Sequence, residues 1–217
     1  MWMFREPLEK ILIGLAVRLF IVAVIFPLHE MAHGLVANWL GDPTAKRMGR
    51  LTLNPLVHMD IFGTLCIFLL GFGWAKGVPV NPNNFKNRKA GMALTALAGP
   101  VSNIIAAFIG MILFHIFSPG LVHNGAIHYM FYVYITVNLS LAVFNLFPIP
   151  PLDGSKILAV LIPDRFMETF YQYERYFFIV LIMVVFSGVL DVPIYFLVDL
   201  LETGLSWAAS GIVGIFR

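Results

Sequence analysis

The chain has 217 residues, of which 59% are hydrophobic and only 12% are charged. A soluble domain carries about 25% charged residues, so this composition excludes an ordinary soluble domain and indicates a membrane protein. The net charge of +2 is too small to indicate nucleic-acid binding, and the single cysteine, Cys66, excludes an internal disulfide framework and a zinc site built from several cysteines.

The first predicted element is a long apolar helix from Leu8 to Leu40, which Gly41-Asp42-Pro43 ends. It exceeds the roughly 20 residues that are needed to cross a bilayer. Arg5 and Lys10 precede the run, as in a signal peptide, but no small-residue cleavage site follows it. We therefore interpret the segment as a retained membrane span. Arg18 lies inside it, and we expect its side chain to extend to the membrane surface or to pair with a carboxylate.

The same run carries the pattern His29-Glu30-x-x-His33. Residues four apart on a helix share a face, so the two histidines can offer their imidazoles to one metal ion. Glu30 lies beside them and can take a proton from a water molecule at the site. Ionisable side chains inside a membrane are costly and usually functional. The pattern therefore predicts a zinc site for hydrolysis that needs a third protein ligand from elsewhere in the chain.

Residues 42–60 and 75–89 are polar and rich in turn-forming residues, and they flank the apolar run 61–74. That run is too short for an ordinary span, so we expect it to be re-entrant, interfacial or buried. Alternation at 50–53 and a short stretch at 77–80 favour some β structure. Residues 42–89 are therefore expected to form one small membrane-associated β/hairpin region.

His58 and Asp60 form an H-x-D pair within this region. The pair either binds a second ion or joins the metal site, or it supplies the hydrogen bonds of a turn, which is the favoured interpretation.

Two further long helices are predicted at 90–117, with a stop at Ser118-Pro119-Gly120, and at 126–147. The first contains Gly99-Pro100-x-x-Asn103, in which Asn103 either stabilises helix packing or lines the site. The second runs into Pro148-Ile149-Pro150-Pro151, where an α-helix cannot continue. Irregular backbone at membrane depth is tolerated where it lines a buried site or a wet cavity.

Asp153 follows this forced break, which is where a carboxylate can be aimed inward as the third ligand. An Asp-Gly turn at a membrane surface explains it equally well from the local sequence. Beyond it, residues 155–170 predict a short interfacial helix, and residues 174–190 and 192–216 predict a fourth and a fifth span.

These motifs resemble those of the site-2 proteases, which are intramembrane zinc metalloproteases. The chain has H-E-x-x-H in a membrane helix, G-P-x-x-N in a later helix, and N-x-x-P-x-P-P-x-D-G at a third helix end. The resemblance covers roughly residues 20–160. It implies that His29, His33 and Asp153 hold one zinc ion per chain. It also implies Glu30 as the base and Asn145 as a residue that holds the substrate or the oxyanion.

The fold class that follows is an all-α multi-pass membrane protein, with a three-helix catalytic core and additional transmembrane helices. The chain has no room for a PDZ domain or a C-terminal nucleotide-sensing domain, so it is close to the bare catalytic core. We expect a single membrane-embedded peptidase domain over 1–217. Its catalytic core covers about 8–160, and its accessory helices cover about 174–216.

A metal site also constrains the topology. The histidines lie near the end of the first helix that faces residue 42, and Asp153 follows the helix 126–147. These groups can meet only if the run 61–74 dips into the membrane and returns. Nine cations then share one side, which the positive-inside rule makes cytoplasmic: Lys46, Arg47, Arg50, Lys76, Lys86, Arg88, Lys89, Lys156 and Arg165. The 118–125 loop and the N-terminus are expected outside, although Arg5 and Lys10 argue mildly against this.

The expected function is hydrolysis of peptide bonds in or near the transmembrane segments of membrane proteins, in the cell membrane, with the active site towards the cytoplasm. The expected partners are a transmembrane protein or peptide substrate and the lipid bilayer, and no nucleic acid. The alternative is a zinc-binding membrane protein or transporter without hydrolytic activity, which needs the histidines and Asp153 but no base.

Overall fold

The computed structural model describes residues 8–121, 125–163 and 176–215. Four helical stretches in this part of the chain are long and apolar enough to cross a membrane: Leu12–Trp39, Arg88–Phe117, Ile127–Leu146 and Asp191–Ile215. The described residues contain no sheet. The predicted class of an all-α, multi-pass membrane protein is thereby confirmed.

The first long helix is continuous but changes its winding just before the histidine pair. It consists of α1 (Leu8–Phe20), the π-helical stretch η2 (Ile21–Ile25) and α2 (Phe26–Trp39). Pro27 has no backbone N–H and cannot donate to the preceding turn, which gives the π-helical stretch a local cause. Gly41 follows the helix with a φ of +106°, a conformation that favours glycine.

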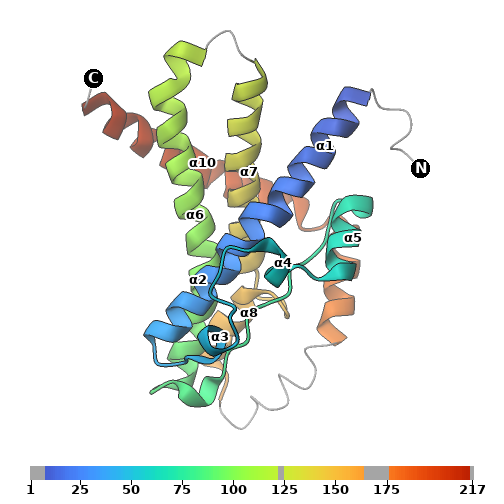
Figure 1. Ribbon diagram of the computed structural model, residues 1–217, viewed down its shortest axis with the longest axis vertical. Coiled ribbons are helices and arrows are strands. Elements are labelled where there is room, and N and C mark those ends of the chain that lie inside the picture. Colours follow the sequence, from blue (N-terminus) through green and yellow to red (C-terminus); the bar gives the residue numbers. More distant parts are fainter. Residues whose placement is uncertain (1–7, 122–124, 164–175, 216–217) are drawn as a thin grey trace.

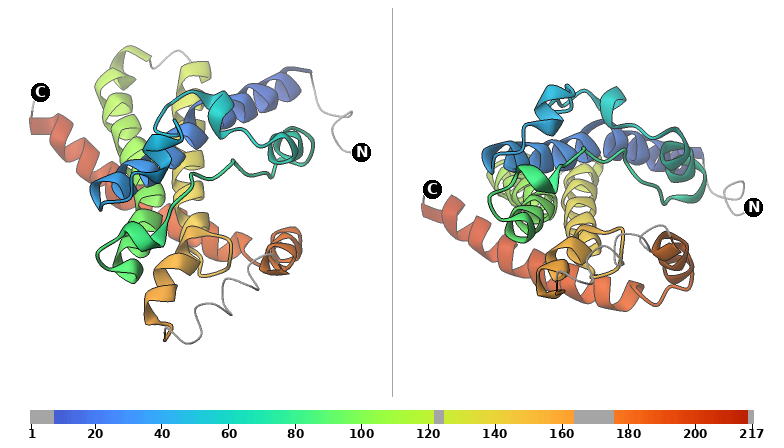
Figure 2. Two further views of the ribbon diagram at one scale, coloured as in Figure 1. Left: turned by 60° about the horizontal axis from the view of Figure 1, so that its bottom comes forward. Right: turned by 90° about the horizontal axis from the view of Figure 1, so that it is seen from below.

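The long helices are arranged in three layers (Figures 1 and 2). In the middle, α6 (Arg88–Leu121) and α7 (Gly125–Leu146) stand side by side. The α1–α2 helix crosses one side of this pair, and α10 (Asp191–Ile215) crosses the opposite side. The end of α6 differs from the prediction, because the helix continues through 118–120 to Leu121.

Small and aliphatic side chains form the core where α6, α7 and α10 meet. Its buried members are Ala107, Met111, Ile135, Leu139, Val143, Val198 and Ala209. On the outside of the same helices, large apolar side chains such as Ile105, Tyr195 and Trp207 are exposed. Soluble monomers rarely expose apolar surface so broadly, so this exterior fits contact with lipid.

The prediction of β structure in residues 42–89 is not supported. This region, all of which the structure describes, folds into short helices: α3 (Thr44–Arg47), α4 (Pro55–His58), α5 (Ile61–Leu70) and η3 (Pro82–Asn84). One isolated antiparallel bridge joins Met59 and Ala75. Strands need a neighbour along their length, and the 77–80 stretch instead gives its backbone groups to side chains of other segments.

The chain still reverses around α5, which is a hairpin built from a helix and an extended return. Its ten residues extend about 15 Å, half of the hydrocarbon thickness of a bilayer. Asp60 accepts a hydrogen bond from the Gly63 N–H (2.8 Å) and so caps the start of α5. The His58 ring is bonded through Nε2 to the Thr52 carbonyl (2.8 Å). The H-x-D pair therefore supplies turn and cap hydrogen bonds, as the favoured interpretation expects.

Arg18 contacts a main-chain carbonyl in place of the carboxylate that was one of its two expected partners. Its guanidinium donates to the carbonyl of Phe68, near the C-terminal end of α5. A cation at this end of a helix satisfies a carbonyl that has no helical donor and complements the helix dipole. Arg18 thus joins the first long helix to the short helix of the hairpin.

After α7 the chain forms a turn through the prolines and then α8 (Asp153–Leu158) and η4 (Ala159–Leu161). The predicted interfacial helix 155–170 therefore begins earlier, and its part from 164 on lies outside the described residues. The described part of the predicted span 174–190 is the short helix Tyr176–Phe186. The predicted fifth span corresponds to α10.

Candidate metal centre

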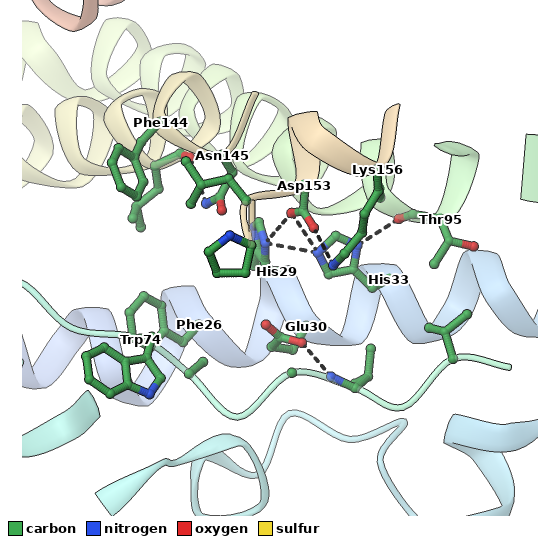
Figure 3. A pocket seen from close by; sticks show the side chains of 18 of the residues that line it. Phe26, His29, Glu30, His33, Trp74, Thr95, Phe144, Asn145, Asp153 and Lys156 are labelled. Atoms are coloured by element: carbon green, nitrogen blue, oxygen red, sulfur yellow. Dashed lines mark hydrogen bonds and ion pairs between the residues drawn. The ribbon is translucent and has the colours of Figure 1, made fainter. Parts of the chain in front are cut away.

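Three donor atoms from two distant segments meet beside α6 (Figure 3). His29 and His33 project from α2, and Asp153 stands at the start of α8. The two histidine Nε2 atoms are 3.0 Å apart, and Asp153 Oδ2 lies 3.3 Å from His29 Nε2 and 3.1 Å from His33 Nε2. All three side chains are buried. Among the residues that the structure describes, this is the one group of three such ligands.

These distances fit zinc. Zinc–nitrogen bonds of about 2.0–2.1 Å at the tetrahedral angle place neighbouring ligand atoms about 3.3–3.4 Å apart. The three atoms form a triangle of nearly this size, and two nitrogens with one carboxylate oxygen are a common ligand set of catalytic zinc. His29, His33 and Asp153 are therefore the residues that could hold the ion.

The turn before Asp153 brings this residue to the histidines. Leu152 is extended (φ −62°, ψ 155°), and α8 begins with Asp153 directly after it. A Cβ atom at Gly154 would come within 2.1 Å of the Leu146 carbonyl oxygen, so α8 packs closely against the last turn of α7. Glycine at 154 permits this approach, and the proline break makes the chain turn back to reach it.

Helix α6 supplies contacts that sequence patterns did not indicate. The Thr95 carbonyl accepts a hydrogen bond from His33 Nδ1 (2.7 Å), which leaves His33 Nε2 to face the cluster. A Cβ atom at Gly99 would lie 2.4 Å from His33 Nε2 and 2.5 Å from His29 Cε1. The two imidazole rings therefore pack directly on the backbone of α6, and Gly99-Pro100 was the signal that could have shown this close approach.

A cavity of about 620 Å³ opens beside the cluster. Glu30 lines it, and the Glu30 carboxylate accepts a hydrogen bond from the Val78 N–H (2.8 Å) in the extended return of the hairpin. Asn145 lines the same cavity and donates one N–H of its amide to the Leu141 carbonyl (2.9 Å). The structure thus brings together all five residues that the sequence singled out: His29, Glu30, His33, Asn145 and Asp153.

Lys156 is a sixth polar residue at this site, and its position follows from the helical spacing to Asp153. Its Nζ lies 3.4 Å from Asp153 Oδ1, the carboxylate oxygen that is not shared with the histidines. Burial by itself raises the pKa of the Asp153 carboxyl. The combined effect of His33, His29 and Lys156 lowers this pKa by more than burial raises it. The resulting pKa lies below its usual range, so Asp153 is a carboxylate that can accept a cation.

Two further histidines of the described residues, His115 and His128, lie away from the cluster. His115 and His128 line a separate cavity of about 450 Å³ with Glu202 and Ser206, between α6, α7 and α10. His123 lies outside the described residues.

Comparison with known proteins gives the family. The family described as Peptidase family M50 matches residues 114–187. The protein named "Putative zinc metalloprotease YwhC" from Bacillus subtilis is 44% identical over 165 residues, which are 74% of this chain and 75% of that protein. The protein named "Putative zinc metalloprotease Rip2" from Mycolicibacterium smegmatis is 32% identical over 134 residues, which are 58% of this chain and 50% of that protein. No solved structure matches. With this similarity over three quarters of a relative, the chain belongs to peptidase family M50, the site-2 protease family of zinc metalloproteases.

Proposed function

We propose that this chain is an intramembrane zinc metalloendopeptidase that hydrolyses peptide bonds in or near transmembrane segments of membrane proteins. The observation that carries the proposal is the triangle of His29, His33 and Asp153 at zinc-like spacing, enclosed by apolar helices that are long enough to span a bilayer. Glu30 lines the same cavity, and a binding or transport site has no need of this carboxylate.

In this proposal His29, His33 and Asp153 hold one zinc ion per chain. When bound, zinc polarises a scissile carbonyl and lowers the pKa of water. The Glu30 carboxylate accepts the proton of the attacking water and passes it to the leaving amine. The hydrogen bond from the Val78 N–H holds that carboxylate at the cavity wall. The Asn145 amide nitrogen has a second hydrogen beside the one given to Leu141, and it stabilises the oxyanion.

The substrate enters as extended chain, because a helix uses its peptide groups in its own hydrogen bonds. Gly77, Val78 and Val80 belong to the extended return of the hairpin and line the cavity. We propose that this stretch receives the substrate by β-strand addition, in which backbone groups other than the Gly77 carbonyl and the Val78 N–H align the scissile carbonyl.

The proposed topology places the site towards the cytoplasm of the cell membrane, with residues 118–125 and the N-terminus outside. It is supported by the contact between the two polar segments that flank α5. The Asp42 carboxylate accepts hydrogen bonds from the Asn81 N–H (2.7 Å) and from Asn84 Nδ2 (2.7 Å). Both segments carry cations, so the positive-inside rule favours the cytoplasmic side. The chain then forms one peptidase domain, with a catalytic core over about 8–160 and accessory helices over about 174–216.

The experiment compares wild type with Glu30→Gln in liposomes that contain a single-span substrate. Glutamine keeps the size of Glu30 but removes the base, and general-base catalysis typically contributes about 10²–10⁴-fold in rate. We expect the variant to keep its zinc and to lose cleavage by about this factor. Glu202→Gln, which removes another intramembrane carboxylate outside this cavity, is the matched control and should cleave as wild type does. Cleavage by Glu30→Gln at the wild-type rate would contradict a hydrolytic role and favour the zinc-binding or transport function.

A further inference from the structure

Two side chains beside the metal centre have buried polar atoms with no partner in the part of the chain that the structure describes. They are His29, through Nδ1, and Asn103, through both Oδ1 and Nδ2. A buried polar group that makes no hydrogen bond costs about 1–3 kcal/mol. Such groups are rare in native proteins and call for a specific explanation. Both residues line the cavity beside the cluster of His29, His33 and Asp153.

The spacing of residues along α6 argues that Asn103 lies near His29. Thr95, Gly99 and Asn103 are spaced by four residues, so they lie on one face of the helix. Thr95 contacts His33, and a Cβ atom at Gly99 would lie 2.4 Å from His33 Nε2 and 2.5 Å from His29 Cε1, the ring atom between Nδ1 and Nε2. Proceeding from Thr95 to Gly99 along α6 thus leads from His33 towards His29. Asn103 stands one helical turn further in this direction.

The burial of Asn103 argues against a role in substrate binding. Asn103 has 0% of its surface exposed, so it cannot touch a substrate that lies in the open part of the cavity. His29 Nδ1 is likewise enclosed. Polar atoms that are enclosed in the cavity wall in this way can satisfy each other or share one buried water, since such a water needs two or more polar partners.

We propose that Asn103 positions His29: its Oδ1 accepts the hydrogen of His29 Nδ1, directly or through one buried water. This bond fixes the His29 tautomer with Nε2 unprotonated and facing the cluster, as the Thr95 carbonyl does for His33. One face of α6 therefore orients both histidines. The main-chain carbonyl of Thr95 orients His33, and the side chain of Asn103 orients His29. The inference rests on the proposed zinc site and adds a residue that acts through His29.

The test measures the zinc dissociation constant of the purified full-length chain by competition with a chelator. Loss of such an outer partner typically weakens metal binding by about 10–100-fold. We expect this loss for Asn103→Leu, which keeps the volume but has no acceptor. Asn103→Asp keeps an acceptor and should bind zinc within about threefold of wild type or more tightly.

Asn138→Leu is the matched control. Asn138 is also fully buried in a membrane helix with an unpaired side-chain oxygen, but it does not line this cavity. Its replacement should leave the zinc affinity unchanged. Wild-type affinity in Asn103→Leu would overturn the inference and leave the proposed function intact. An equal loss in Asn103→Asp would also overturn it, because it would point to packing. If wild type binds no zinc, the proposed function and this inference both fail. Should Asn103→Leu not fold, Asn103→Ala is measured against Asn103→Asp with the same expectations.

Discussion

Gly99 illustrates at the residue scale how the absence of a side chain shapes this site. The two imidazole rings occupy the space in which any Cβ atom at position 99 would lie, with His33 Nε2 at 2.4 Å. Real Cβ atoms do not approach other atoms so closely, and close-packed interiors have little room for adjustment. A side chain here must displace the two histidine rings from their present positions. Glycine is therefore required by the neighbouring rings and not by its own backbone conformation.

We accordingly predict that Gly99→Ala lowers zinc content and cleavage together. Displaced ligands should weaken zinc binding by at least about tenfold, which is the lower range for disturbed metal surroundings. Zinc per chain is measured on purified protein, with His29→Ala/His33→Ala as the metal-free reference. Gly204→Ala in α10 is the control, because a Cβ atom there meets nothing within 4 Å. Full zinc content in Gly99→Ala would show that the rings can move without loss of the site.

At the scale of elements, the Asp42 carboxylate connects the end of the first long helix to the 81–84 turn of the hairpin region through hydrogen bonds. Asp42 is fully buried, and it accepts hydrogen bonds from the Thr44 N–H (3.1 Å) and from two groups of the 81–84 turn. Burial by itself raises the pKa of Asp42. The hydrogen bonds from Thr44, Asn84 and Asn81 lower this pKa by more than burial raises it. The net pKa lies below the ordinary value of 3.8, so folding favours the ionised form.

We predict that Asp42→Asn destabilises the fold by about 2 kcal/mol at neutral pH, in the range of hydrogen bonds to charged groups. Because the folded pKa is depressed, the contribution of Asp42 is complete above pH 3.8 and is lost as the pH falls through the folded pKa. The difference between wild type and variant should therefore narrow below about pH 4.

Denaturant or thermal unfolding in detergent between pH 3 and pH 7 measures this difference. Asp199→Asn, at an exposed position of α10, should have little effect at any of these pH values. A difference for Asp42→Asn that does not depend on pH would show that the charge of Asp42 is not what stabilises the turn.

At the scale of the whole molecule, the contact of His29 and His33 in α2 with Asp153 in α8 limits how the chain can cross the membrane. The α5 hairpin is too short to cross a bilayer, so the segments before and after it are expected on one side. The Asp42 contacts join the same two segments directly. The C-terminal end of α6 and the N-terminal end of α7 lie at the opposite end of these long helices from α3 and α8, as Figure 1 shows, and are expected on the other side.

This topology predicts the labelling of single cysteines in a Cys66→Ser background. Cysteines in place of Lys46 and Asn83, both exposed, should react equally with an impermeant reagent that is applied from the cytoplasmic side. A cysteine in place of Gly125, at the start of α7, should react from the opposite side. Opposite labelling of positions 46 and 83 would show that the hairpin crosses the membrane, and the proposed topology would fail.

The sequence alone determined the membrane class, the spacing of the histidines and the forced break before Asp153. These features follow from side-chain periodicity along a helix and from the missing N–H of proline, which are local properties. It also indicated the reversal around α5 through the shortness of the apolar run. The family motifs favoured Asp153 as a ligand, which local sequence left open, and they alone indicated Asn145.

The tertiary structure alone decided what surrounds the cluster. It replaced the expected β structure of 42–89 by short helices, because the backbone groups there found partners in other segments. It also placed the Thr95 carbonyl on His33, and every residue has a carbonyl, so no pattern of side chains marks this one. Asn103 had two interpretations in the sequence, and its place in the cavity wall, with buried polar atoms that have no partner among the described residues, favours the site. The hydrogen bond between His33 and the Thr95 carbonyl joins residues 62 positions apart in the chain, and packing of α2 on α6 brings them together.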